Sequence, residues 1–143
     1  MIEITDYKHI VQYYETDKMG VAHHSNYIRW MEEARVDFLE QTGWSYARLE
    51  EAGVISYVVN INCDFKHPTH FSDTVYILAN ITELRGVTLK FSYEMKNGDG
   101  TLVCTGTSTH AFFSAEGKPV RVKRDYPELY ETLSGLVKGE ETA

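Results

Sequence analysis

A single long helical repeat, followed by strand-like alternation toward the end of the chain, narrows the folds open to this sequence. Tyr27, Met31, Ala34 and Phe38 recur at i, i+4, i+7 and i+11, and Trp30 lies beside them. At 3.6 residues per turn these side chains share one face of a helix. Such an apolar face has to pack on another layer of structure, so the helix predicts a layered fold.

The ends of this helix are marked by residues with capping and stop preferences. Ser25 and Asn26 are the candidate N-terminal caps, and Gly43 is the expected stop. A second, short helix is expected over Tyr46–Ala52, with Ser45 as its cap.

From Ile55 onward the apolar residues alternate with polar ones, which is the period of a half-buried strand. The strands are joined by short turns, of which Asn97–Gly100 is a strong hairpin signal. Short connections favour antiparallel neighbours. Strands are expected over residues 7–14, 55–65, 75–81, 87–95 and 102–113.

The predicted fold class is α+β, with one long helix against a five-stranded antiparallel sheet. Gly106 is a possible bulge in the last strand. A terminal helix is expected over about residues 125–137, with Asp125 as its cap. A length of 143 residues predicts one domain, residues 1–143.

Composition excludes several classes of function. A net charge of −7 argues against nucleic acid as the main partner. No apolar run is long enough to span a membrane, and the N-terminus lacks the layout of a signal peptide, so a cytoplasmic protein is expected. Cys63 and Cys104 lie far apart in strand-like runs, which indicates buried reduced thiols.

Possible chemistry concentrates just before the long helix. Asp17, Gly20, His23 and His24 place a carboxylate, a turn glycine and two imidazoles next to a helix N-terminus. The unpaired N–H groups there can hold the oxyanion that develops when an acyl carbonyl is attacked. Hydrolysis of an acyl group at this corner is therefore the first hypothesis.

The residues at this corner resemble a known family signature, that of hotdog-fold acyl-CoA thioesterases of the 4-hydroxybenzoyl-CoA thioesterase type. The resemblance extends through Trp30 and Ala34-Arg35, and the later strand order is similar to the hotdog layout. The matching segment reads Tyr14-x-Thr16-Asp17-x-x-Gly20-Val21-x-x-His24-x-x-Tyr27.

The resemblance implies a hotdog fold, in which the five-stranded sheet wraps around the long helix. It also implies a thioesterase that hydrolyses a small or medium acyl-CoA at an active site formed at a dimer interface. Asp17 would be the nucleophile or general base, with His24 assisting it. The backbone at the helix start would be the oxyanion hole, supported by Gly20, Val21 and His23. No cofactor is implied, because coenzyme A is part of the substrate.

Further residues are expected to contact an acyl-CoA or to remain outside the site. The histidines of the HPTH segment, His67 and His70, are not expected to bind a metal with His23 and His24. A homodimer or homotetramer is expected, because a small sheet with an open edge needs cover. The weaker candidates for substrate binding are Tyr14, Tyr27, Lys66, Arg85 and Lys90.

Two other functions stay open from the sequence. One is a hotdog hydratase or dehydratase, in which a histidine and a carboxylate would move protons at C2 and C3 of an acyl thioester. The other is a non-catalytic acyl-CoA-binding module, since a fold does not imply a function. Glu32 and Glu33 on the helix are expected to be solvated or to pair with Arg29 and Arg35.

Overall fold

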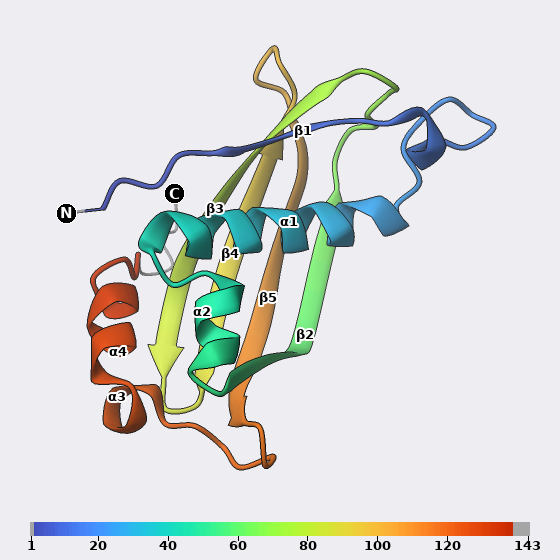
Figure 1. Ribbon diagram of the computed structural model, residues 1–143. Coiled ribbons are helices and arrows are strands. Elements are labelled where there is room, and N and C mark those ends of the chain that lie inside the picture. The colour runs from blue at the N-terminus through green and yellow to red at the C-terminus, as the bar shows by residue number, and fades with distance from the viewer. Residues whose placement is uncertain (1, 139–143) are drawn as a thin grey trace.

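The computed structural model describes residues 2–138 and has the element order expected from the sequence. Figure 1 shows one long helix crossing a sheet of strands, with the short helices beyond it. The elements are β1 (Tyr7–Ile10), the 3₁₀ turn η1 (Tyr13–Glu15), α1 (Ser25–Thr42), α2 (Tyr46–Glu51), β2 (Val54–Phe65), β3 (Thr74–Arg85), β4 (Thr88–Lys96), β5 (Leu102–Ser114), α3 (Val122–Asp125) and α4 (Pro127–Ser134).

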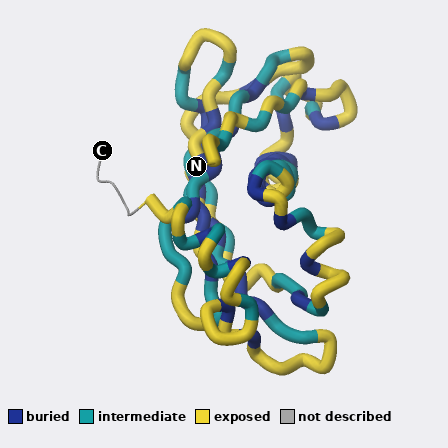
Figure 2. The backbone as a smooth tube through the Cα atoms, turned by 60° about the vertical axis from the view of Figure 1, so that its left-hand side comes forward, coloured by how far each residue is buried: buried dark blue, intermediate teal, exposed yellow. Residues whose placement is uncertain are grey.

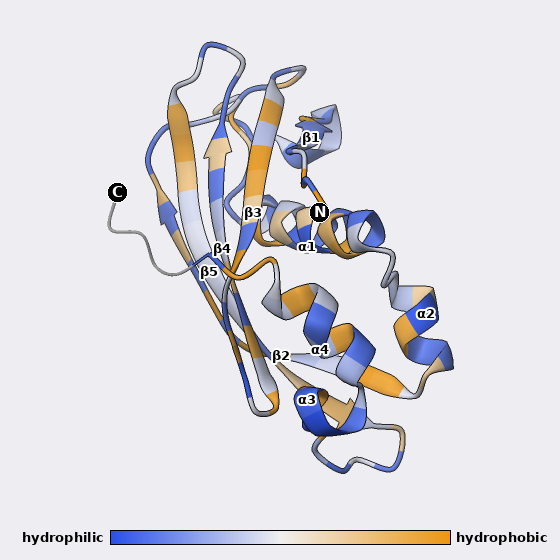
Figure 3. Ribbon diagram, turned by 90° about the vertical axis from the view of Figure 1, so that its left-hand side faces the viewer, coloured by the Kyte–Doolittle hydropathy of each residue, from blue (hydrophilic) through white to orange (hydrophobic). Residues whose placement is uncertain are grey.

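The sheet is five-stranded and antiparallel, as predicted, and its strands lie in the order β1-β3-β4-β5-β2. Its helices gather on one side, which Figure 3 shows most clearly. In Figure 2 the loops at both ends of the sheet are largely exposed, whereas buried positions recur along the strands and on α1. Within residues 2–138 no helix combines the length and the apolar character needed to cross a membrane.

The predicted apolar face of α1 forms one side of the core. Its five residues are all 3% exposed or less, and the ring of Phe38 packs edge-on against Phe91 at 5.2 Å between centroids. Alternate residues of β3 and β4 form the other side, as the period of two predicts. They are Val75, Ile77, Ala79, Ile81, Leu89, Phe91, Tyr93 and Met95.

The predicted caps of α1 are wrong. The helix begins at Ser25, and its N-cap residue is His24. Ser25 lies inside the first turn, where its Oγ contacts Nδ1 of His23 at 2.9 Å. Asn26 is buried and donates from Nδ2 to the carbonyl of Glu15 at 2.9 Å, so its side chain holds the preceding loop and does not cap the helix.

The predicted C-terminal end of α1 and the predicted N-terminal cap of α2 are correct. Gly43 ends α1 with φ = 87°, a left-handed conformation that glycine adopts without a steric penalty. Ser45 caps α2, its Oγ accepting from the N–H of Arg48 at 3.2 Å.

The first strand is shorter than the predicted range of residues 7–14. It ends at Ile10, and the chain then turns through η1. The N–H of Gln12 donates to Oε1 of Glu15 at 2.8 Å, and the N–H of Glu15 donates to the carbonyl of Gln12 at 3.0 Å. These two hydrogen bonds hold the chain in a turn, so the strand does not continue beyond Ile10.

Gly106 is not a bulge, because it stays in register with Tyr93 on one side and Cys63 on the other. A Cβ at this position would lie 2.5 Å from the carbonyl oxygen of Asn62 and 2.9 Å from Cε of Met31. The glycine therefore allows α1 to approach the sheet closely.

The C-terminal helix expected over residues 125–137 is found as α4, Pro127–Ser134, with the single turn α3 before it. Asp125 does not cap α4: its Oδ2 accepts from the N–H of Arg121 at 3.0 Å and closes α3. Leu129 and Leu133 of α4 are fully buried.

Candidate functional site

The loop between η1 and α1 is closed by its own backbone. The N–H of Asp17 donates to the carbonyl of Val21, and the N–H of Gly20 donates to the carbonyl of Asp17, both at 2.9 Å. Gly20 has φ = 79°, a conformation that L side chains rarely adopt. The loop is also bonded to the segment between β2 and β3, because the N–H of Ala22 donates to the carbonyl of Thr69 at 2.8 Å.

Asp17 is exposed, and only one oxygen of its carboxylate is hydrogen-bonded within the described residues. Oδ1 accepts from the N–H of Met19 at 2.8 Å, the usual pattern of an aspartate that starts a turn. Within residues 2–138, Oδ2 accepts no hydrogen bond. The turn therefore fixes the carboxylate through one oxygen and leaves the other open to a ligand.

The first turn of α1 offers a free backbone donor close by in sequence. The N–H groups of Asn26 and Tyr27 donate to the carbonyls of His23 and His24 at 3.0 and 3.2 Å, and that of Ser25 donates to Nδ1 of His23 at 3.2 Å. The N–H of His24 has no acceptor in the described part of the chain. A helix N-terminus favours negative charge at such a donor.

Asp17 and His24 line the same groove, whose volume is about 380 Å³. Its floor includes Tyr27 and Phe65, whose rings pack edge-on at 5.2 Å between centroids. The walls come from the loop before α1, from the start of α1 and from the segment that follows β2. The lining residues are Asp17, Val21, Ala22, His24, Tyr27, Phe65, Lys66, His67 and Pro68.

A second hollow of about 760 Å³ lies on the other side of Asp17. The rings of Tyr13 and Phe71 meet edge-on there at 5.7 Å. Tyr14, 82% exposed, also lines this hollow, together with Lys18 and other loop residues. Asp17 therefore lines two hollows of different size.

The predicted substrate-binding residues are not all brought together. Lys66 and Tyr27 both line the groove of Asp17, but Tyr27 is only 3% exposed and its hydroxyl is 2.9 Å from Oγ1 of Thr69. Burial raises the pKa of Tyr27. Arg85 ends β3 and Lys90 lies two residues into β4, so both sit at the opposite end of the sheet in one subunit (Figure 1).

The histidines are spread around the groove. His23 and His24 are exposed, with their rings 4.1 Å apart between centroids. His67 lines the groove, while Nδ1 of His70 lies 3.6 Å from Oδ2 of Asp73. No group of three or more His, Cys, Asp or Glu side chains within residues 2–138 could hold a metal ion.

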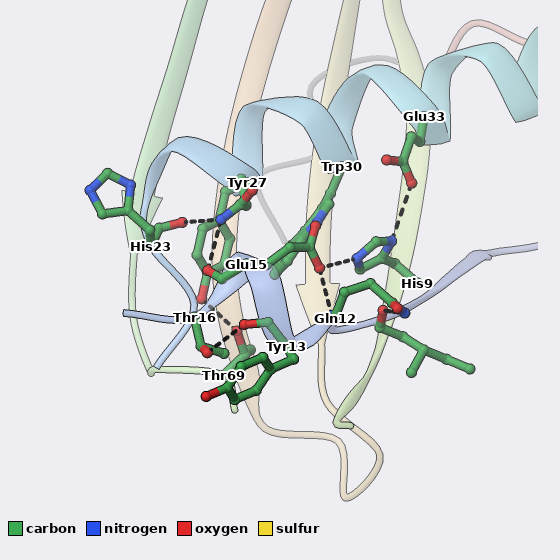
Figure 4. A network of polar contacts seen from close by, with 12 residues as sticks. His9, Gln12, Tyr13, Glu15, Thr16, His23, Tyr27, Trp30, Glu33 and Thr69 are labelled. Atoms are coloured by element: carbon green, nitrogen blue, oxygen red, sulfur yellow. Dashed lines mark hydrogen bonds and ion pairs between the residues drawn. The ribbon is translucent and has the colours of Figure 1, made fainter. Parts of the chain in front are cut away.

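Sequence reasoning missed a polar cluster around the buried carboxylate of Glu15, under the first half of α1 (Figure 4). We call it the Glu15 cluster, and it comprises His9, Gln12, Glu15, Asn26 and Trp30. The Glu15 carboxylate is 6% exposed and accepts from Nε1 of Trp30 and from the N–H of Gln12, each at 2.8 Å. The one available signal is the spacing of Gln12 and Glu15, which is that of a capping box.

A second buried cluster lies under the later half of α1, and we call it the inner cluster: Arg35, Tyr46, Tyr93, Ser108 and His110. Arg35 is 5% exposed and donates from Nε to the hydroxyl of Tyr46 at 2.7 Å. Its NH1 lies 3.3 Å from Nε2 of His110, which also contacts Oγ of Ser108 at 2.7 Å. Arg35 is four residues after Met31 and three before Phe38, so its place at the edge of the apolar face could have signalled burial.

Glu32 and Glu33 differ in their partners. Oε1 of Glu32 lies 3.9 Å from NH2 of Arg35, so the expected pair is present although long. Glu33 instead contacts Nδ1 of His9 at 3.2 Å and accepts from the hydroxyl of Tyr7 at 2.8 Å. This second pairing joins α1 to β1, which the sequence spacing along the helix did not predict.

Comparison with known proteins gives consistent matches. The family model described as the thioesterase-like superfamily matches residues 11–133. YneP of Bacillus subtilis (strain 168), provisionally named an acyl-CoA thioesterase, is 34% identical over 121 residues, which cover 84% of this chain and 88% of YneP. YbgC of Escherichia coli O157:H7, named an acyl-CoA thioester hydrolase, is 30% identical over 93 residues, which cover 65% of this chain and 69% of YbgC.

A solved structure extends the comparison to three dimensions. The structure described as a DHNA-CoA thioesterase from Staphylococcus aureus is similar with a TM-score of 0.86 and 32% sequence identity. The match covers 92% of this chain and 89% of the other. The similarity therefore extends over most of this chain.

Proposed function

The chain belongs to the thioesterase-like superfamily, and from that premise we propose that it hydrolyses acyl-CoA thioesters in the groove beside Asp17. The membership confirms the family resemblance and the hotdog fold class inferred from the sequence. One observation supports this location most directly. Asp17 has a free carboxylate oxygen and His24 a free backbone N–H in the described chain, and both residues line one groove.

The proposed reaction uses these two groups at the thioester carbonyl. The carbonyl oxygen would accept from the N–H of His24, where the positive end of the α1 dipole stabilises the developing oxyanion. Oδ2 of Asp17 would face the carbonyl carbon. The hydrogen bond from Met19 to Oδ1 holds the carboxylate in this orientation.

Two routes are compatible with this arrangement. As a nucleophile, Oδ2 bonds to the acyl carbon and the coenzyme A thiolate leaves; water then hydrolyses the acyl anhydride, releasing the acid and restoring the carboxylate. As a general base, Oδ2 removes a proton from the water that attacks the carbonyl, and that proton passes to the departing thiolate. The exposed imidazole of His24 would assist by orienting water in either route.

The groove offers separate surfaces to the two parts of the substrate. Val21, Ala22 and Phe65 are apolar and suit an acyl group or the pantetheine arm, while Lys66 is a cation suited to a phosphate of coenzyme A. No cofactor takes part in either route, because the carboxylate, the backbone N–H and water supply the reacting groups.

We also propose a homo-oligomer, a homodimer or homotetramer. The edge strand β2 leaves Tyr57, Val58, Val59 and Phe65 more than half exposed, and an apolar edge strand is usually covered by pairing. Gel filtration with light scattering should give a mass of two or four chains, and a monomer would contradict the proposal.

The cytoplasm is the proposed location, in keeping with the free thiols of Cys63 and Cys104.

Free thiol release from a panel of aromatic and aliphatic acyl-CoA thioesters tests the proposed activity. We expect Asp17→Asn to lower kcat by about 10³-fold or more, as the loss of a nucleophile or base does in comparable enzymes. Because Asp17 is exposed, the free energy of unfolding should change by less than about 0.5 kcal/mol. An Asp17→Asn protein with wild-type activity would remove this mechanism.

The same panel separates the other functions. A hydratase or dehydratase would change the absorbance of an enoyl- or hydroxyacyl-CoA without releasing thiol. A binding module would retain acyl-CoA in equilibrium dialysis with no turnover. Neither alternative is favoured by the relatives described above, whose names are those of thioesterases and a thioester hydrolase.

A further inference from the structure

The carboxylate of Glu15 is buried two residues before Asp17 and is held by three separate elements. Oε1 accepts from the N–H of Gln12, the residue before η1, and contacts Nε2 of His9 on β1, each at 2.8 Å. Oε2 accepts from Nε1 of Trp30 on α1 at 2.8 Å. Figure 4 shows these partners converging on the carboxylate from different sides. The side chain therefore joins β1, η1 and α1.

The backbone of Glu15 holds the other end of the loop. Its carbonyl accepts from the N–H of His23 at 2.8 Å and from Nδ2 of Asn26 at 2.9 Å. His23 directly precedes His24, and Asn26 is buried in the first turn of α1. The segment from Thr16 to Ala22 therefore begins and ends at points that are fixed by one residue.

We propose that Glu15 is a positioning residue that sets the distance between the Asp17 carboxylate and the backbone N–H of His24. This inference rests on the proposed function, because that distance matters only if both groups act on one carbonyl. Glu15 itself does not line either hollow beside Asp17. It acts through the loop, and an error of about 1 Å in such a geometry can cost about 10²-fold in rate.

The position requires a carboxylate, because an ionised carboxylate only accepts hydrogen bonds and three donors point at it. A glutamine of the same length would turn an N–H₂ group toward one of those donors. Burial opposes ionisation of Glu15, but the hydrogen bonds from Gln12, His9 and Trp30 together lower its pKa.

Glu33 provides a matched control within the same network. Its Oε1 contacts the other ring nitrogen of His9, Nδ1, at 3.2 Å. Within residues 2–138 Glu33 makes no hydrogen bond to the loop that carries Asp17; its partners are His9 and Tyr7. Glu15→Gln and Glu33→Gln therefore make the same chemical change on the two sides of one imidazole, and only the first disturbs the anchor of the loop.

The experiment measures kcat and KM for Glu15→Gln and Glu33→Gln on the best acyl-CoA of the panel. We expect Glu15→Gln to lower kcat by about 10²-fold with KM within about 3-fold of wild type, and Glu33→Gln to keep kcat within about 2-fold. Gly106→Ala, which destabilises the core away from the loop, should keep kcat per folded molecule. A loss of kcat in Gly106→Ala as large as in Glu15→Gln would overturn the proposal, because it would follow from lowered stability alone.

Three further results decide the proposal. A folded Glu15→Gln protein with wild-type kcat, or with a raised KM alone, overturns it. If Glu15→Gln does not fold, Trp30→Phe is measured in its place, because it removes one donor to Oε2 but keeps an aromatic ring. We then expect kcat to fall by about 10-fold with KM unchanged. An unchanged kcat in Trp30→Phe overturns the proposal. If Asp17→Asn is inactive while Glu15→Gln is normal, only the positioning role fails; if Asp17→Asn is fully active, the proposed function fails with it.

Discussion

Each half of α1 covers a buried polar cluster, and the two clusters differ in what they can affect. In the Glu15 cluster the carboxylate has three partners, and its residue is bonded to an exposed loop next to a groove. In the inner cluster His110 is fully buried, and its Nδ1 has no hydrogen-bond partner in the described chain. The first cluster can therefore influence the proposed reacting surface, whereas the second lines neither hollow beside Asp17 and is expected to act on stability.

The bonding of the inner cluster fixes the state of its histidine. A guanidinium can only donate, so Nε2 of His110 accepts from Arg35, and the ring proton lies on Nδ1. The hydroxyl of Tyr93 then donates to Ser108, which donates to Nε2, each at 2.7 Å. Burial, with the nearby charge of Arg35, lowers the pKa of His110 to about 3, so the ring stays neutral.

The largest expected effect on stability comes from removing this ring. His110→Ala leaves a cavity and two unpaired donors, and we expect the free energy of unfolding to fall by about 3 kcal/mol. Because the inner cluster does not line the groove of Asp17, kcat per folded molecule should not change. Urea unfolding and thiol release measure the two effects.

His110→Gln is the matched control, because a glutamine can place an acceptor near the position of Nε2 and should lose less stability. If His110→Ala lowers kcat by 10-fold or more in the folded protein, the division between the two clusters is wrong.

The next effect appears when the pH is lowered. The folded pKa of His110 is depressed to about 3, whereas in the unfolded chain it is near the ordinary value of about 6.5. Below pH 6.5 the unfolded chain binds a proton that the folded chain does not. This histidine should therefore cost about 1.4 kcal/mol of stability per pH unit, or about 2 kcal/mol between pH 6.5 and pH 5.

Unfolding curves of the wild type and of His110→Gln at pH 7, 6 and 5 isolate this contribution, since the other titrating groups are common to both proteins. The variant should lose less stability than the wild type over this range. Parallel losses would show that His110 does not stay neutral in the folded protein. Glu15 contributes at lower pH than His110. Because its pKa is lowered in the folded protein, Glu15 stabilises the fold at pH values above its ordinary pKa, and this stabilisation is lost as the pH falls through its pKa in the folded protein.

The sequence predicted α1 and the sheet because both depend on local periodicity. The face of Tyr27, Trp30 and Phe38 is buried as expected, and the predicted stop at Gly43 was correct. The turn at Asp17 and Gly20 was also visible, because an aspartate and a glycine at that spacing favour a turn in any context.

The two polar clusters could not be predicted in the same way. Glu15 is bonded to Trp30, fifteen residues later, and Arg35 to His110, seventy-five residues later. Such pairs depend on the final packing of α1 on the sheet and leave no periodic signal. The caps failed for a related reason: Asn26 is a good cap by preference, but the buried carbonyl of Glu15 takes its side chain.

A smaller effect should come from the contact between α1 and the sheet that lies between the clusters. Gly106→Ala places a Cβ within 2.5 Å of the Asn62 carbonyl and 2.9 Å of Cε of Met31, so backbone and helix have to shift. We expect a loss of about 1–3 kcal/mol in the free energy of unfolding. Gly98→Ala is the control, since its Cβ would meet nothing within 4 Å, and it should change stability by less than about 0.5 kcal/mol. Equal stability of the two variants would contradict the close approach of α1 to the sheet.

The smallest effect sharpens the comparison at Tyr27, which lies under the groove but belongs to the core. Its hydroxyl contacts Oγ1 of Thr69 at 2.9 Å, and both residues are buried. Tyr27→Phe leaves the Thr69 hydroxyl unpaired, so we expect a loss of about 1 kcal/mol in stability. The pair Tyr27→Phe with Thr69→Val replaces both polar groups, and it should cost less than the two single changes added together. KM for acyl-CoA should not change in either protein, because the hydroxyl is already satisfied inside the chain; a several-fold rise in KM would instead make Tyr27 a substrate contact and extend the reacting surface into the core.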